Sequence, residues 1–190
     1  MENSLIKYLL NFGDIAESEQ NQIFSAFTRM SFKSGDRLCC AGEITKQLFF
    51  INKGILKITI PDDEISEITY YFLKEKQFVS FLYSMYGNVP AEQSLQAACD
   101  TEVMMINKDD LYRLYEQLPY LKIMMNEISN LSMVKMVNLK STYLNGNSSK
   151  KYSLFLKQEP EIALKIALTD IASYLGITPQ SLSRIRKNIR

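Results

Sequence analysis

The segment from Met30 to Ile106 constrains the fold most, because it consists of short apolar runs separated by turn-forming residues. Runs such as "LFFINKG", "ILKITI", "ISEITYYFL" and "TEVMMI" have the length of β-strands. Glycine, aspartate and proline interrupt them in "KSGD", "AGE" and "PDDE". Short strands at this spacing, about 8–12 residues apart, are typical of an antiparallel sandwich or barrel. We therefore expect an all-β domain in this part of the chain.

Helical patterns lie on both sides of this segment. Before it, Leu5, Ile6, Leu9 and Leu10 share one helical face, and a second helix is expected after a cap at Ser18. After it, "KDDLYRLYEQL" predicts a short helix that ends before Pro119. The expected fold class is therefore α+β.

A long helix is expected from Pro119 to Leu144, because this stretch has no glycine and no internal proline. Its apolar residues fall on two sides. A helix that is apolar on two sides usually lies between two surfaces, here its own sheet domain and a partner subunit. Packing wholly within one chain is the alternative. The second side is formed by Met133, Val134, Met136 and Val137. The stripe assigned to the dimer interface consists of Leu121, Met124, Ile128, Leu131, Lys135 and Asn138.

The chain contains no histidine, which excludes several classes of site. Ser-His-Asp and Cys-His catalysis, histidine-ligated haem and histidine-rich metal centres all require that residue. The three cysteines Cys39, Cys40 and Cys99 do not form a paired framework, and we expect free thiols in a reducing compartment. The sequence therefore predicts no cofactor, no metal site and no enzyme activity.

Charge is distributed unevenly along the chain. Residues 146–190 hold eight Lys or Arg and three Asp or Glu, whereas residues 1–145 hold fourteen basic and eighteen acidic residues. A basic C-terminal part on an acidic body is typical of a nucleic-acid-binding module attached to another domain. The polar stretch from Asn145 to Lys151 is the expected linker between the two.

The segment "ALTDIASYLGITPQSLSRIRKNIR" has the spacing of a helix-turn-helix. Ile171 and Leu175 are one turn apart, Gly176 stands where the first helix must end, and Pro179 follows Thr178 as a helix start signal. The second helix of this motif lies in the major groove of DNA. Gln180 suits adenine and Arg184 suits guanine, while hydroxyl and lysine side chains suit phosphates. An ordinary helical hairpin with a basic end is the alternative. The predicted DNA-binding residues are Thr169, Thr178, Gln180, Ser181, Ser183, Arg184, Lys187 and Asn188.

Taken together, these segments resemble the CRP/FNR family of bacterial transcription regulators. The resemblance is carried by "FKSGDRLCCAGEITKQLFFINKGILKI", "FVSFLYSMYGNVPAEQSLQAACDTEVMMI" and "DIASYLGITPQSLSRIRK", the last being most similar to Bacteroidetes-type members. It implies an N-terminal double-stranded β-helix, or jelly roll, of the cyclic-nucleotide-binding type. It also implies a long dimerisation helix and a C-terminal helix-turn-helix. The family commonly continues into a β-hairpin wing, and none is evident before Arg190.

The effector pocket implied by the resemblance departs from the cyclic-AMP-binding pattern. Members that bind cyclic AMP carry a Gly-Glu pair aligned with "FVSF", and an arginine about ten residues later pairs with the phosphate. Ser80 and Phe81 stand at the first positions here, and Ala91 beside Glu92 at the second. Cyclic AMP is therefore not the expected effector. Phe81, Tyr83 and Tyr86 are candidates for an apolar pocket around Ala91 and Glu92, unless they only fill the barrel.

The expected protein is a cytoplasmic, homodimeric transcription regulator that binds double-stranded DNA and RNA polymerase. The expected domains are residues 1–117 for the β-roll with its N-terminal helices, 118–145 for the dimerisation helix and 146–190 for the helix-turn-helix. No membrane segment is expected, because no stretch approaches the roughly 18 apolar residues that a spanning helix needs. The alternative is a jelly-roll module for a small ligand or a protein, with a degenerate DNA-binding domain.

Overall fold

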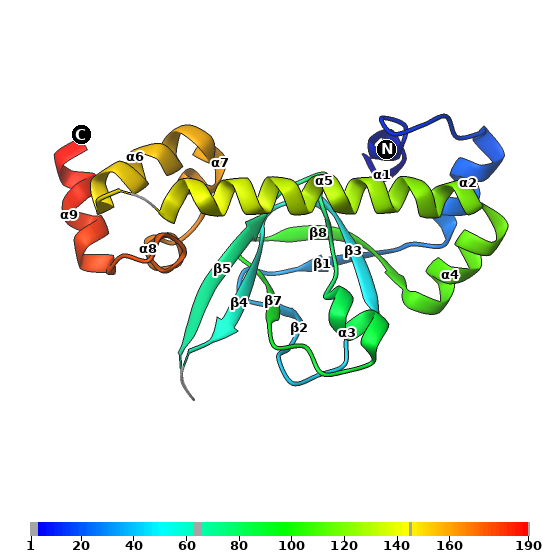
Figure 1. Cartoon of the computed structure of the whole chain (residues 1–190), viewed down its shortest axis with the longest axis horizontal. Helices are drawn as coiled ribbons and strands as arrows, with labels where there is room; N and C mark the ends of the chain where they lie inside the picture. Colours follow the sequence, from blue (N-terminus) through cyan, green and yellow to red (C-terminus); the bar gives the residue numbers. More distant parts are fainter. Residues whose placement is uncertain (1–3, 63–65, 145, 190) are drawn as a thin grey trace.

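The structure is a computed structural model that describes residues 4–62, 66–144 and 146–189. Figure 1 shows the long helix α5 (Pro119–Leu144) running along the whole molecule. The β-strands lie against its middle, the N-terminal helices lie near one end, and the C-terminal helices lie at the other end. The α+β class and the antiparallel jelly roll followed by helices are confirmed.

Two four-stranded antiparallel sheets form the jelly roll. Their strand orders are β1-β8-β3-β6 and β2-β7-β4-β5. The strands are β1 (Thr28–Phe32), β2 (Arg37–Cys39), β3 (Gln47–Lys53), β4 (Leu56–Pro61), β5 (Glu67–Leu73), β6 (Phe78–Val79), β7 (Ser94–Ala97) and β8 (Thr101–Asn107). Phe49 and Val103 from the first sheet and Leu56 and Leu95 from the second meet in one buried cluster. Successive side chains of a strand point to opposite faces, so these apolar residues point into the roll. Short apolar runs were therefore sufficient to predict the sheets.

Four helices surround the roll on its N-terminal and outer sides. They are α1 (Ser4–Leu9), α2 (Glu17–Ser25), α3 (Leu82–Gly87) and α4 (Lys108–Gln117). Leu5, Ile6 and Leu9 of α1 are buried as predicted, whereas Leu10 is exposed. The predicted cap at Ser18 is wrong, because α2 starts one residue earlier, at Glu17, after Ala16. The backbone N–H of Ala16 donates to the Glu19 carboxylate, which stabilises that start.

Four further helices follow α5. They are α6 (Ser148–Gln158), α7 (Pro160–Lys165), α8 (Leu168–Leu175) and α9 (Pro179–Ile189). The predicted linker Asn145–Lys151 is mostly wrong, because Ser148 to Lys151 form the first turn of α6. The Asn147 side chain caps that turn by accepting from the Lys150 backbone N–H at 2.9 Å. Position 145 lies outside the described residues.

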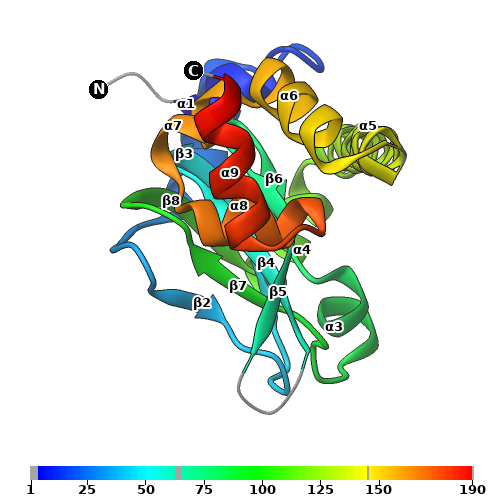
Figure 2. The ribbon, with the colours of Figure 1, turned by 90° about the vertical axis from the view of Figure 1, so that its left-hand side faces the viewer.

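A third buried cluster joins the C-terminal helices to the roll. It contains Tyr152 and Phe155 of α6, Ile171 of α8, Leu182 of α9 and Phe72 of β5. Figure 2 views the molecule from this end, with α8 and α9 in front of the sheets. Because α8 packs on β5, the C-terminal helices contact the β domain directly as well as being joined to α5.

Candidate nucleic-acid interface and effector cavity

The helix-turn-helix is formed by α8 and α9. Ile171, Ala172 and Leu175 make the buried face of α8, and Leu182 of α9 packs against them. Gly176 ends α8 in the left-handed conformation with φ 65°, which an L-residue with a Cβ adopts at a cost. Thr178 precedes α9, and its Oγ1 accepts from the Ser181 backbone N–H at 3.1 Å. Turn glycine and N-cap are therefore where the sequence pattern predicted them.

The predicted DNA-binding residues occupy the outer surface of this motif. Gln180, Ser183, Arg184, Lys187 and Asn188 of α9 are exposed, and so are Thr169 of α8 and Thr178. Ser181 is half-buried, and the Thr178 hydroxyl bonds to its Oγ at 2.9 Å, so Ser181 has a structural partner. The helix carries Arg184, Arg186 and Lys187 and no acidic residue. This surface therefore presents cations and amides to an approaching polyanion.

Polar contacts hold α8 against the β domain. Lys57 Nζ of β4 lies 2.8 Å from Asp170 Oδ1, and both side chains are largely buried. The Thr69 backbone N–H donates to Ser173 Oγ at 2.9 Å, which extends the edge of β5 to the helix. The rings of Phe72 and Tyr174 meet edge to face.

A second ion pair extends this contact to the start of α7. Lys74 Nζ lies 2.6 Å from the carboxylate of Glu159, whose side chain is almost completely buried. A charge this far from water is stable only when it is paired. The position of the helix-turn-helix is therefore set by specific contacts with the roll.

The β-roll has a cavity of about 530 Å³ that is bounded by β4 and β5 of the second sheet, by α3 and the residues just before it, by the segment 91–93 and by α5. Four predicted pocket residues, Phe81, Tyr83, Ala91 and Glu92, line it. Its other walls include Ile58, Ser80, Gln93, Tyr70 and Met136. Among these lining residues there is no lysine or arginine, and Glu92 is an acid, so the cavity offers an anionic phosphate no cation.

Tyr86 does not belong to this cavity, which corrects the prediction for that residue. It is half-exposed on α3, where its ring meets that of Tyr112 and the Lys108 ammonium lies over both rings. Burial raises the pKa of Tyr86 above its ordinary value, with Tyr112 adding to the effect. Tyr70 and Met136 also line the cavity but were not predicted to do so, because they belong to β5 and α5, far from Phe81 in the chain.

The two apolar sides of α5 face other surroundings than those predicted. Leu121, Met124 and Ile128 are 2%, 5% and 1% exposed and pack in the chain's own core with α1 and α4. They are not available to a second subunit, so this part of the predicted dimer stripe is wrong. Leu131, Lys135 and Asn138 are exposed.

An apolar face of α5 is left uncovered instead. Its exposed residues are Ile123, Leu131, Met133, Val134 and Val137, each more than half exposed. Ile123 and Val134 are three helical turns apart and therefore lie on one line. Three of these residues belong to the second apolar side that the sequence pattern had indicated.

The cysteines are free thiols, as predicted. Cys39 is buried in the roll, which raises the pKa of its thiol to about 12, with Cys40 and Glu43 nearby adding to the effect. Within the described residues, no group of three or more histidine, cysteine or acidic side chains could hold a metal ion. None of the helices described is long and apolar enough to cross a membrane.

Comparison with known proteins agrees with this architecture. Residues 29–118 match the cyclic nucleotide-binding domain family. No curated protein matches the chain in sequence. Solved structures of regulators are similar over nearly the whole chain. A putative transcriptional regulator of the CRP/FNR family from Eubacterium rectale superposes with a TM-score of 0.71 at 21% identity, over 96% of this chain and 87% of that one.

Two further solved structures show the same similarity in fold. FixK2 from Bradyrhizobium japonicum has a TM-score of 0.72 at 13% identity and covers 86% of this chain and 84% of its own. The c-di-GMP responsive global regulator CLP of Xanthomonas campestris has a TM-score of 0.71 at 13% identity, over 92% and 91%. Residues 29–118 therefore match the cyclic nucleotide-binding domain model, and the chain has the fold seen in a CRP/FNR-family transcriptional regulator.

Proposed function

We propose that the protein is a homodimeric, DNA-binding transcription regulator whose α9 enters the major groove. The observation that carries this proposal is the outer face of α9, where Gln180, Arg184 and Lys187 are exposed and no acid is present. Side chains in the first half of such a helix reach base edges, and those further along reach phosphates. The similarity in fold to a transcriptional regulator of the CRP/FNR family and to the global regulator CLP supports the same function.

The proposed dimer uses the apolar face of α5. Ile123, Val134 and Val137 are 71%, 57% and 57% exposed on one side of a helix that lies along the outside of the molecule (Figure 1). A second copy of the same helix would bury these residues by isologous contact. The α9 helix of each copy would then face one half-site of a palindrome.

The proposed effector is not a cyclic nucleotide. The cavity in the roll has aromatic and apolar walls and one acid, Glu92, but no cation among its lining residues. A phosphate would lose the charge-assisted contact that dominates its recognition and would lie near a carboxylate. A neutral ligand fits this lining better. It would contact Met136, a residue of α5, so its binding would act directly on that helix. RNA polymerase remains the proposed partner at promoters.

Selection of random duplex DNA by the purified full chain at physiological salt tests this function. The expected result is an enriched palindrome with half-sites about one helical turn apart. Affinity for that site should fall steeply with salt, because each neutralised phosphate releases counterions. Absence of any enrichment, with folded dimer present and with cavity ligands screened, would contradict the proposal.

A further inference from the structure

The jelly roll has a second cavity, which lies away from α5. It measures about 440 Å³ and is bounded by β1, β3 and β8 of the first sheet, by β2 and by the loop that joins β2 to β3. No residue of α5 or of the C-terminal helices is among those that line it. A cavity of this volume is within the usual range of small-molecule sites.

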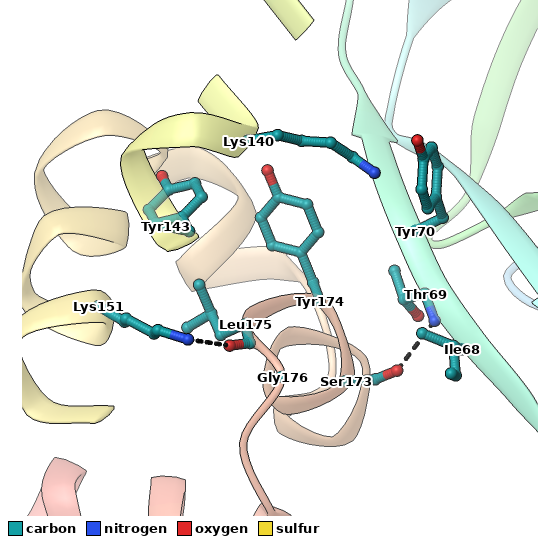
Figure 3. Close-up of a pocket in the computed structure, with 10 residues that line it drawn as sticks. All are labelled: Ile68, Thr69, Tyr70, Lys140, Tyr143, Lys151, Ser173, Tyr174, Leu175 and Gly176. Carbon is teal, nitrogen blue, oxygen red and sulfur yellow. Dashed lines mark hydrogen bonds between the residues drawn. The ribbon is translucent and has the colours of Figure 1, made fainter. Parts of the chain in front are cut away.

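This cavity is separate from two other hollows of the molecule. It shares no lining residue with the 530 Å³ cavity beside α5. A hollow of about 290 Å³ lies between β5 and the end of α8. There the ring of Tyr174 packs edge to face on Tyr143, and Lys140 and Lys151 lie on different sides of Tyr174 (Figure 3). A ligand in the 440 Å³ cavity would therefore touch only the β domain.

The cavity is open because β2 covers little of the first sheet. This strand has three residues, and its register with β7 shifts within them. Opposite it, Met30, Phe32 and Met105 are only half-buried. They lie on the inner face of the first sheet, as does Val103, which is completely buried. Apolar side chains that are partly open to water gain free energy when a ligand covers them.

One polar side chain in the lining has an unused hydrogen-bonding group. Thr45 is 4% exposed, and its backbone N–H donates to Ser84 Oγ at 2.9 Å. Its own hydroxyl oxygen is buried and has no hydrogen-bond partner among the residues that the structure describes. A buried hydroxyl without a partner costs free energy, which a polar group of a ligand would offset.

The charges around the cavity favour an uncharged ligand. Two charged residues line it, Arg37 and Glu43. The Arg37 guanidinium lies 3.0 Å from the carboxylate of Glu67, so this cation already has a partner. Burial raises the pKa of the Cys39 thiol, which also lines the cavity, to about 12. A charge placed beside that thiol would likewise lose hydration.

We propose that this cavity binds small uncharged amphiphiles such as medium-chain alcohols. The hydroxyl of the ligand bonds to Thr45 Oγ1, and its chain lies against Met30, Phe32 and Met105. Binding stabilises the folded β domain by mass action. It depends neither on the proposed DNA binding nor on the proposed effector of the cavity beside α5.

Nuclear magnetic resonance of isotope-labelled methionine methyl groups locates the ligand. The full chain is titrated with n-octanol, and each signal is assigned with a Met→Leu variant. Met30 and Met105 line the proposed site, whereas Met136 lines the cavity beside α5 and Met133 is exposed on α5. We expect saturable shifts of the Met30 and Met105 signals and unchanged signals from Met136 and Met133.

Thr45→Val tests the polar contact, because valine has the shape of threonine without its hydroxyl. Thr59→Val is the matched control. Thr59 is also buried with an unpartnered hydroxyl, but it is not among the residues that line this cavity. Both variants should raise the melting temperature of the unliganded protein, because each removes a buried hydroxyl without a partner. Only Thr45→Val should weaken octanol binding, by about fivefold, the effect of one neutral hydrogen bond.

Charged analogues of the same chain length test the class of ligand. We expect octanoate to bind about tenfold more weakly than octanol, since its carboxylate must lose hydration near Glu43. Octylammonium should also bind more weakly than octanol, because Glu43 is exposed and an exposed ion pair contributes little.

Four results would overturn the assignment. The first is no saturable shift with wild-type protein that circular dichroism shows to be folded. The second is a shift of Met136 without shifts of Met30 and Met105, which would place octanol beside α5. The third is equal octanol affinity for Thr45→Val and Thr59→Val. The fourth is tighter binding of either charged analogue than of octanol. A chain that selects no DNA yet shows the expected titrations would contradict only the proposed function.

Discussion

Arg184 and Lys187 are both exposed cations on α9, but we expect them to act differently. Arg184→Ala should lower affinity for the selected site by about 1–3 kcal/mol and relax preference at one base pair, because a bidentate contact to guanine is lost. Lys187→Ala should weaken binding evenly across sequences and reduce the salt slope by about one. Binding isotherms on the selected site and on single-base variants measure both effects. An unchanged base preference in Arg184→Ala would contradict its assignment.

Tyr71 makes stability sensitive to alkaline pH. Burial raises the pKa of this phenol from 10.0 to about 12, and the carboxylate of Glu159 adds to the shift. The folded state therefore holds a proton that the unfolded state releases first, so the contribution is complete below pH 10 and is lost as pH rises from about 10 towards 12. We expect the melting temperature of Tyr71→Phe to fall less than that of the wild type as pH rises from about 10 to about 12.

Melting curves at closely spaced pH values check this expectation. The variant keeps the buried ring of Tyr71 and removes only the hydroxyl. Tyr83→Phe, in which a ring that is 75% exposed loses the same group, is the control and should follow the wild type. An equal fall in melting temperature with pH for Tyr71→Phe and the wild type would contradict this role of Tyr71.

At the scale of elements, the ion pair between Lys57 and Asp170 ties β4 to α8. Its side chains are 14% and 23% exposed, so removing one partner leaves a poorly solvated charge. We expect Asp170→Asn to lower the free energy of unfolding by about 1–3 kcal/mol. The double variant Lys57→Met, Asp170→Asn should recover part of this loss, since no unpaired charge remains.

Urea denaturation monitored by circular dichroism measures these changes. Asp110→Asn is the matched control, because it removes an ion pair with Arg113 on the surface of α4, where the side chains are 41% and 70% exposed. A surface pair of this kind contributes about 0–1 kcal/mol. Equal effects of Asp170→Asn and Asp110→Asn would show that the contact between α8 and the sheet is not tied by this pair.

At the scale of the whole molecule, the proposed dimer depends on the exposed apolar face of α5. We expect Val134→Glu combined with Val137→Glu to raise the dimer dissociation constant by about two orders of magnitude, because like charges would face each other across a symmetric apolar contact. Sedimentation equilibrium measures this. Ser129→Glu, an exposed position of α5 about 140° around the helix from Val134, is the control and should stay dimeric. A double variant that dimerises like the wild type would contradict the proposed face.

The sequence by itself determined the features that depend on local chemistry. Strand-length runs between Met30 and Ile106, the turn at Gly176 and the cap at Thr178 follow from backbone preferences of a few neighbouring residues. The absence of histidine could likewise be read without coordinates, and so could the lack, at Phe81 and Ala91, of the glutamate and arginine that the resemblance implies for cyclic-AMP binding.

Only the tertiary structure decided which surfaces meet. Periodicity showed that α5 has two apolar sides, but both satisfy the same helical spacing, and the side that faces the roll is chosen by packing against α1 and α4. The same holds for Tyr70 and Met136 in the roll cavity and for Lys57 beside Asp170. Each of these brings together residues far apart in the chain. Such contacts are fixed by the free energy of burying the whole fold and leave no local pattern in the sequence.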